Sequence, residues 1–238
     1  MTAPLDCRAL LFDLDGALVD SAPDLWGAMN HVLIRHNFAP LPLERVRHLV
    51  GHGARALLAR GFWGDGAESP LNDPEFEVAV TEFLEYYRLH LTDHSVPFPH
   101  VSTTLARLTD LGFAMAVVTN KPEMLARLML EQLDLMRFFS VVVGGDTLPV
   151  RKPDPGPLFY ALKQLGVPTA QGVMLGDSET DLQAARNARI PVILFSYGYN
   201  RGIDVRDLGP DHVADHFDQL PNLLHSLQPS RTMSTCHN

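Results

Sequence analysis

Residues 9–15 have the sequence ALLFDLD, an apolar run that ends in two acidic side chains, Asp13 and Asp15. A short apolar run of this kind is typical of a buried strand. Residues two apart on an extended segment point to the same side, so the two carboxylates repel each other unless a cation neutralises them. Mg²⁺ favours one or two carboxylates together with water and phosphate oxygens. The alternative is that both are turn acids before Gly16 that cap the next segment.

Further apolar runs follow along the chain, with helical patterns between them. They are FAMAVVTN (113–120), VVVGGD (141–146), GVMLGDS (172–178), PVILFSYG (191–198) and, as an edge strand, HVADHF (212–217). The helical patterns cover residues 124–133, 157–167 and 181–189. Alternating strands and helices form right-handed crossovers and a parallel sheet with helices on both faces. The sequence therefore predicts an α/β fold with a doubly wound, Rossmann-like core.

The stretch from about residue 21 to residue 92 has a different pattern, because it reads as helices only. It lies between the first strand and the rest of the sheet, which is the position of an inserted cap domain. We expect residues 1–20 and 95–228 to form the core, residues 21–94 to form an all-helical cap, and residues 229–238 to be a disordered tail. The aromatic residues of the cap, such as Trp26 and Phe83, are expected in its core.

Other distinctive polar residues also follow strand runs, where ligands bind to an open parallel sheet. Thr119 and Asn120 precede a helix and offer groups that suit phosphate oxygens, and the alternative, more common for such a pair, is a helix cap. Lys152 lies in a loop that Pro153 and Pro155 stiffen. An ammonium group held there would stabilise phosphoryl charge, and the alternative is an exposed loop lysine.

The segment GDSETD (176–181) contributes two more carboxylates. Asp177 is placed to complete a metal site with Asp13. Asp181 either takes part in this site or caps the helix that follows, and the sequence leaves both roles open.

These segments resemble the motifs of the haloacid dehalogenase superfamily. The likeness rests on FDLDG (12–16), VTNKP (118–122), KPDP (152–155) and GDSETD (176–181), which occur in the family's order. It extends to the bacterial phosphoglycolate phosphatases within that superfamily. That extension rests on DSAPDL (20–25), FPHV (98–101), SVVVGGD (140–146) and YGYN (197–200), and the whole likeness covers roughly residues 8–225.

The resemblance implies a role for each matching residue. Asp13 would be the nucleophile that carries the phosphoryl group, and Asp15 would protonate the leaving alkoxide and then activate water. Mg²⁺ would be held by Asp13, by the backbone carbonyl of Asp15 and by Asp177. Thr119 and Lys152 would bind the transferring phosphoryl oxygens, with Asn120 beside them. The chain departs from the family at Ala17, where a threonine is usual; that threonine would support the loop and the acid at position 15.

The resemblance also implies a reaction, the hydrolysis of 2-phosphoglycolate to glycolate and phosphate. Within the cap, the loop GHGARALL (51–58) is the expected substrate loop, where Gly53 allows close approach and Arg55 would bind a carboxylate. The alternative for Arg55 is a solvated helix face, and His52 is expected to be a positioning or surface residue. Other readings are a different sugar-phosphate phosphatase, a pyrophosphatase, a sugar phosphomutase or a non-catalytic protein of the same fold.

The net charge of −9 disfavours nucleic acid as a partner, because a phosphate backbone binds basic surfaces. A small phosphate monoester is the expected partner. The sequence contains Cys7 and Cys236, no disulfide framework, no signal peptide and no apolar run long enough to cross a membrane. We therefore expect a cytoplasmic monomer or homodimer.

Overall fold

The predicted strand runs form one parallel sheet in a computed structural model that describes residues 4–65, 67 and 73–226. The six-stranded sheet has the order β6-β5-β2-β7-β8-β9, and every neighbouring pair is parallel. Its strands are β2 (Ala9–Phe12), β5 (Ala114–Val118), β6 (Val141–Val143), β7 (Gly172–Gly176), β8 (Val192–Phe195) and β9 (His212–Ala214). The predicted fold class is confirmed, including the edge position of β9.

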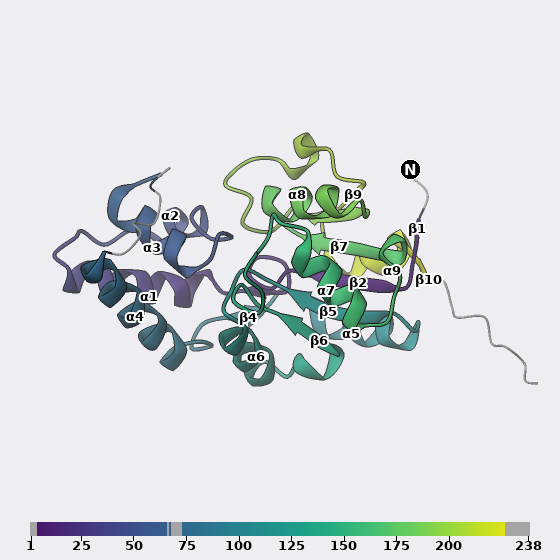
Figure 1. Cartoon of the computed structure of the whole chain (residues 1–238), viewed down its shortest axis with the longest axis horizontal. Helices are drawn as coiled ribbons and strands as arrows, with labels where there is room; N and C mark the ends of the chain where they lie inside the picture. Colours follow the sequence, from purple (N-terminus) through teal and green to yellow (C-terminus); the bar gives the residue numbers. More distant parts are fainter. Residues whose placement is uncertain (1–3, 66, 68–72, 227–238) are drawn as a thin grey trace, which may run out of the picture.

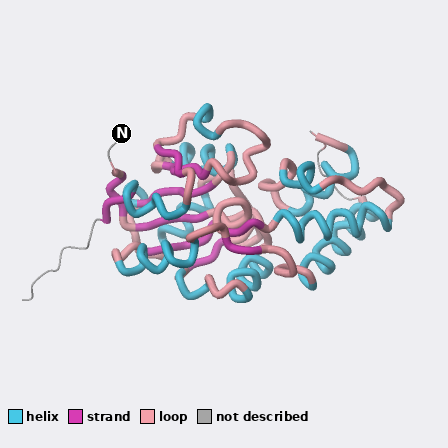
Figure 2. Tube along the Cα trace, turned by 180° about the vertical axis from the view of Figure 1, so that it is seen from behind, coloured by secondary structure: helices cyan, strands magenta, loops and turns pink. Residues whose placement is uncertain are grey.

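Both faces of the sheet are buried, because successive side chains of a strand point to opposite faces. Leu10 and Phe12 of β2 belong to one apolar cluster, and Ala9 and Leu11 belong to the other. The core helices are α5 (Val101–Asp110), α6 (Glu123–Gln132), α7 (Gly156–Gln164), α8 (Glu179–Ala188) and the short α9 (Leu220–Leu223). Apolar residues of α5 and α6 join the first cluster, and those of α7 and α8 join the second. Figure 2 shows the strands side by side with helices on both sides.

Four helices form the part of the chain inserted before the second core strand, and they lie together at one end of the molecule (Figure 1). They are α1 (Ala22–Arg35), α2 (Leu43–Arg47), α3 (Ala54–Trp63) and α4 (Pro74–Leu89). The start of α4 shows why the sequence forms a helix there. Pro74 fits the first turn, and the carboxylate of Asp73 accepts hydrogen bonds from the amides of Glu75 and Phe76. These helices match the expected cap.

The chain crosses between cap and core twice, and the two crossings lie side by side. The strands β3 (Val19–Asp20) and β4 (Val96–Pro97) pair in antiparallel fashion there. The buried carboxylate of Asp24 accepts hydrogen bonds from the backbone amides of His94 and Ser95 and from the Ser95 hydroxyl, at 2.6–3.1 Å. The expected domain boundaries fall at this crossing and stay predictions.

Short elements complete the described chain. β1 (Leu5–Cys7) pairs in parallel with β10 (Leu224–Ser226), a contact between the two ends that the sequence did not indicate. Turns of 3-10 helix cover Met136–Phe138, Thr169–Gln171, Val205–Leu208 and Phe217–Gln219. The expected tail at residues 229–238 lies outside the described residues. No helix in the described ranges combines the length and apolar character that a membrane crossing requires.

Candidate active site

The carboxyl ends of three neighbouring strands bring Asp13, Thr119 and Asp177 together. β2 lies between β5 and β7, so the residues that follow these strands meet at one edge of the sheet. All three side chains are buried. The sequence placed each of them at a strand end, and the order of the strands makes them neighbours.

Lys152 connects two carboxylates at this edge. Its Nζ lies 2.9 Å from Oδ1 of Asp13 and 2.7 Å from Oδ1 of Asp181. Burial lowers the pKa of Lys152, but the charges of both carboxylates outweigh it, so the pKa is raised. Burial also raises the pKa of Asp13 to about 6, with Lys152 opposing the shift and Asp181 adding to it. Lys152 is therefore a buried, charged partner of the expected nucleophile rather than an exposed loop lysine.

Asp13, Asp177 and Asp181 form a buried cluster whose carboxylate oxygens lie within 4.8 Å of one another. Burial raises the pKa of Asp177 well above its usual range, and the charges of Asp181 and Asp13 add to this effect. Hard carboxylate oxygens held close together with so little compensating charge fit a divalent cation such as Mg²⁺. Two of the expected metal ligands, Asp13 and Asp177, belong to this cluster, and Asp181 adds a third carboxylate to it. The expected ligand from Asp15 is its backbone carbonyl and stays a prediction.

Asp181 caps the helix that follows it, one of the two roles that the sequence left open, and it also contacts Lys152. Its Oδ2 accepts hydrogen bonds from the backbone amide and the hydroxyl of Ser178 in a capping box at the start of α8. The same oxygen accepts from the amide of Asp177 at 3.3 Å, while Oδ1 accepts from Lys152. One carboxylate therefore caps the helix and orients the lysine of the site.

Asp15 is held by two donors on the side of the site that faces the cap. The Ser21 hydroxyl donates to Oδ1 of Asp15 at 2.6 Å, and Nζ of Lys121 donates to the same atom at 3.0 Å. Ala17, where the family usually has a threonine, is fully buried, and its carbonyl accepts a hydrogen bond from Tyr197. The hydroxyl that supports the acid in this chain comes from Ser21.

Sequence reasoning gave no role to Lys121 or Tyr87. Nζ of Lys121 donates to the hydroxyl of Tyr87 on α4 at 2.5 Å and lies over its ring, 4.4 Å from the centroid. Burial lowers the pKa of Lys121, and the charge of Asp15 opposes the shift. The only available signal was the place of Lys121 in VTNKP, directly after Thr119 and Asn120.

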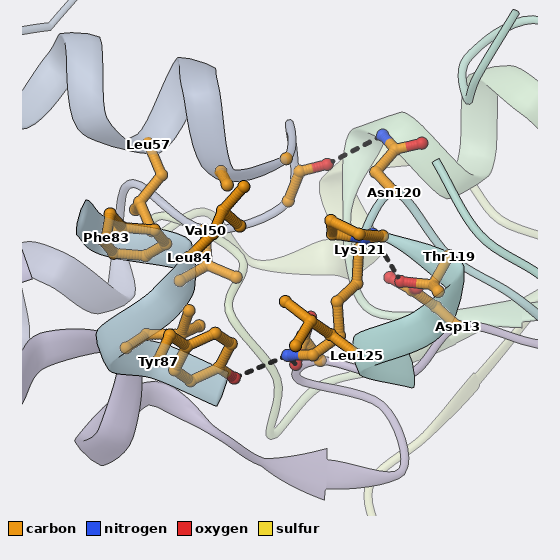
Figure 3. Close-up of a pocket in the computed structure, with 16 residues that line it drawn as sticks. Asp13, Val50, Leu57, Phe83, Leu84, Tyr87, Thr119, Asn120, Lys121 and Leu125 are labelled. Carbon is orange, nitrogen blue, oxygen red and sulfur yellow. Dashed lines mark hydrogen bonds and ion pairs between the residues drawn. The ribbon is translucent and has the colours of Figure 1, made fainter. Parts of the chain in front are cut away.

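Cap and core enclose a pocket of about 40 Å³ beside Asp13 and Asp15. Figure 3 shows cap side chains facing those of the core across it. Apart from Tyr87, the cap contributes apolar side chains: Leu25, Val50, Leu57, Phe83 and Leu84, together with Ala54 and the backbone of Gly51 and Gly53. Phe83 is buried as expected but also lines the pocket, and Trp26, expected in the cap core, is 39% exposed.

The glycine loop of the cap touches the core through Asn120. Nδ2 of Asn120 donates to the carbonyls of Gly51 and Lys152 at 3.1 and 3.0 Å. Oδ1 of Asn120 is buried without a hydrogen-bond partner in the described structure. Gly53 has a φ of +84°, and a Cβ there would lie 3.2 Å from the carbonyl oxygen of Asn120. Both the backbone angle and the close approach explain glycine at this position.

Arg55 lies away from this pocket. Its guanidinium forms two hydrogen bonds with the carboxylate of Glu77, at 2.7 and 2.6 Å, and lies 5.4 Å from the centroid of the Phe76 ring. Arg55 is not among the described residues that line the pocket. The cation that does face the pocket is Lys121.

Comparison with known proteins places this geometry in a family. Residues 10–195 match the model of the haloacid dehalogenase-like hydrolases. A phosphoglycolate phosphatase of Pseudomonas fluorescens (strain Pf0-1) is 40% identical over 90% of this chain and 78% of its own length. One from Colwellia psychrerythraea (strain 34H) is 42% identical over 90% of this chain and 95% of its own.

A solved structure extends the likeness to three dimensions. The crystal structure of a predicted phosphoglycolate phosphatase from Haemophilus somnus superposes with a TM-score of 0.85 at 34% identity, covering 91% of this chain and 97% of that one. The sequence match, the fold and the acidic cluster all point to the same family. The chain belongs to the haloacid dehalogenase-like hydrolase family.

Proposed function

We propose that this protein is an Mg²⁺-dependent phosphatase that hydrolyses 2-phosphoglycolate through an aspartyl-phosphate on Asp13. The observation that carries the choice of substrate is the buried ammonium group of Lys121, which lines the pocket together with apolar side chains of the cap. Lys121 pairs with Asp15, and a second anionic partner in the pocket would further offset the burial that lowers its pKa. A leaving group with a carboxylate meets that need, and the small pocket favours a short one. The names of the relatives support the same substrate.

In the first step, a carboxylate oxygen of Asp13 forms a bond to phosphorus while the bond between phosphorus and the ester oxygen breaks. The electron pair leaves with the glycolate oxygen, which takes a proton from Asp15. In the second step, Asp15 takes a proton from water as the water oxygen attacks phosphorus. The bond to Asp13 then breaks, and inorganic phosphate leaves.

The surrounding residues offset the charge that develops on the phosphoryl group. Lys152 is already 2.9 Å from Asp13. The hydroxyl of Thr119 and the backbone amide of Asn120 would bind phosphoryl oxygens beside it, since the side-chain amide of Asn120 already donates to the carbonyls of Gly51 and Lys152. Mg²⁺, held by Asp13, Asp177 and the carbonyl of Asp15, would neutralise the repulsion between a carboxylate and a phosphate dianion. Both carboxylate oxygens of Asp181 are engaged with Lys152 and the start of α8, so Asp181 orients the lysine.

A small phosphate monoester as the partner and a cytoplasmic location complete the proposal.

The test is phosphate release from 2-phosphoglycolate, hexose phosphates, pyrophosphate and an aryl phosphate, with Mg²⁺ and with a chelator. We expect Mg²⁺-dependent release with a preference for 2-phosphoglycolate. Asp13→Asn should abolish it, because a carboxamide cannot form the acyl phosphate, while Asp110→Asn on the exposed end of α5 should not change it. Turnover by Asp13→Asn would overturn the mechanism. A preference for another phosphate ester would overturn the substrate alone, and an isomerised sugar phosphate would indicate a mutase.

A further inference from the structure

A cluster of basic side chains lies at the seam between cap and core, outside the pocket described above. Arg201 of the core places Nη2 at 3.0 Å from Nδ1 and 3.3 Å from Nε2 of His52 in the cap loop. Nη1 of Arg60 in α3 lies 3.3 Å from Nδ1 of the same ring. Arg151 approaches from the core side, close to Gly53. Two guanidinium groups thus contact one imidazole, and a third lies beside the glycine that follows it.

The cluster carries positive charge without a direct ion pair, although the negative charge of Asp65 acts on Arg60 and Arg201. Among the residues that the structure describes, none of these three guanidinium groups has a carboxylate within 4.0 Å. Burial lowers the pKa of Arg60, and the charge of Arg201 lowers it further. Burial and the charges of Arg60, Arg201 and Arg151 lower the pKa of His52 to about 4, with Asp181 opposing the shift. The imidazole is therefore neutral at pH 7, and the arginines repel one another.

A cavity of about 110 Å³ adjoins the cluster and offers further hydrogen-bonding groups. His52 and Arg201 line it together with Ser178 and Thr180 at the start of α8 and the amide of Asn200. The one carboxylate in its lining belongs to Glu179, whose Oε1 accepts a hydrogen bond from Gln183. Apart from Glu179, its polar lining consists of the guanidinium of Arg201, hydroxyls, amides and the neutral imidazole of His52.

We propose that this cluster is a binding site for a small oxyanion, of the phosphate, sulfate or carboxylate class, which joins the cap to the core. Guanidinium groups bind such anions in a planar, bidentate manner. An anion there would offset the repulsion between Arg60 and Arg201. It would also hold the loop of His52 against the core, because the arginines come from both cap and core. Gly51 and Gly53, on either side of His52, line the proposed active site, so the anion would also affect that site.

The test measures thermal unfolding against sodium sulfate at constant ionic strength. We expect sulfate at about ten times its Kd to raise the unfolding midpoint of the wild type by roughly 3–5 °C. Arg201→Gln should reduce this shift by more than half and bind sulfate at least tenfold more weakly. The matched control is Arg107→Gln on exposed α5, which should keep the full shift. Sulfate at the proposed active site affects all three proteins alike, so it cancels in the comparison.

Equal sulfate shifts in the wild type, Arg201→Gln and Arg107→Gln would overturn the proposal. Arg151→Gln provides a second variant, should Arg201→Gln fold poorly. The site does not depend on the proposed activity, so an inactive protein with a sulfate shift lost in Arg201→Gln would still confirm it.

Kinetics then identify the source of the anion. A KM for 2-phosphoglycolate that rises at least fivefold in Arg201→Gln, with an unchanged KM for an aryl phosphate, would assign the site to the carboxylate end of the substrate. Unchanged KM values together with a lost sulfate shift would assign it to a free anion.

Discussion

At the scale of single residues, Lys121 combines a buried ammonium group with contacts to both halves of the molecule. It donates to Asp15 of the core and to Tyr87 of the cap. The proposed carboxylate of the substrate would add a charged partner to a group that burial otherwise penalises. Lys121 therefore connects the recognition of the leaving group with the position of the expected general acid.

Replacing Lys121 with methionine removes this ammonium group and keeps much of the side-chain volume. We expect kcat/KM for 2-phosphoglycolate to fall by about 10- to 100-fold, as for the loss of a hydrogen bond to a charged group. Turnover of an aryl phosphate should fall less, because its leaving group has no carboxylate. Lys163→Met, on the exposed face of α7, is the control. Equal losses with both substrates would show that Lys121 supports Asp15 and does not bind the carboxylate of the substrate.

His52 predicts a pH dependence of stability. Its pKa is about 4 in the folded protein and about 6.5 unfolded, so between these values the unfolded chain binds more protons. The free energy of unfolding should therefore rise with pH across this window. His52→Gln should lose about 1 kcal/mol of that rise, after allowance for screening at a half-exposed ring. Urea unfolding at pH 4.5 and pH 6.5, without phosphate or sulfate, measures it, and identical slopes in both proteins would contradict it.

At the scale of elements, the paired crossings between cap and core depend on one buried carboxylate. Asp24, in the first turn of α1, accepts from the chain that returns from the cap at His94 and Ser95. A hydrogen-bonded carboxylate at this place determines how the two crossings lie against each other.

Asp24→Ala should lower the free energy of unfolding by roughly 2–4 kcal/mol, because it leaves buried amide and hydroxyl donors without an acceptor. Asp93→Ala is the neighbouring control. It removes an exposed contact with His90, and the expected loss is below about 0.5 kcal/mol. Denaturant titration of both variants checks the prediction, and similar losses would contradict the role of Asp24.

The glycines at the two ends of α3 allow two effects of a glycine-to-alanine substitution to be told apart, backbone strain and contact with the core. Gly53 and Gly64 both have positive φ, +84° and +93°, but only Gly53 lies close to the core at Asn120. Both Gly→Ala variants should lose about 1 kcal/mol of stability. Only Gly53→Ala should also lower kcat/KM, because its methyl group pushes the loop from the core. Equal activity in both variants would show that the approach at Gly53 is not needed for turnover.

At the scale of the whole molecule, an acidic protein concentrates buried negative charge at the edge of its sheet and positive charge at the cap seam. The net charge of the chain is −9. Several of its cations nevertheless lie at or near the contact between cap and core, namely Lys121, Lys152 and the arginines around His52. These cations would attract an anionic substrate, and the proposed Mg²⁺ would offset the negative charge of Asp13, Asp177 and Asp181.

Metal removal provides the prediction at this scale. Mg²⁺ should raise the unfolding midpoint of the wild type by a few degrees (about 2–5 °C), because it binds the folded acidic cluster. Asp177→Asn should abolish this shift. With chelator present, the variant should be more stable than the wild type, because it removes a buried carboxylate that Asp13 and Asp181 repel. Asp110→Asn should respond to Mg²⁺ like the wild type. A full Mg²⁺ shift in Asp177→Asn would exclude Asp177 from the metal site.

Sequence patterns alone predict the parallel core and the strand-end residues of the candidate site. The reason is local: apolar runs and turns define strands, and parallel strands present their carboxyl ends at a single edge. Asp13, Thr119 and Asp177 therefore had to meet once β2 lay between β5 and β7.

The partners that the longer side chains reach depend instead on how the chain packs in three dimensions. Lys121 meets Tyr87 across 34 residues of sequence, and Arg201 meets His52 across 149. These contacts depend on how the cap lies over the core. Arg55, expected at the substrate, pairs with Glu77 instead. The spacing of apolar residues predicts which face of a helix is buried. It does not predict the partner of a long charged side chain, because that partner comes from a segment that only the folded chain brings close.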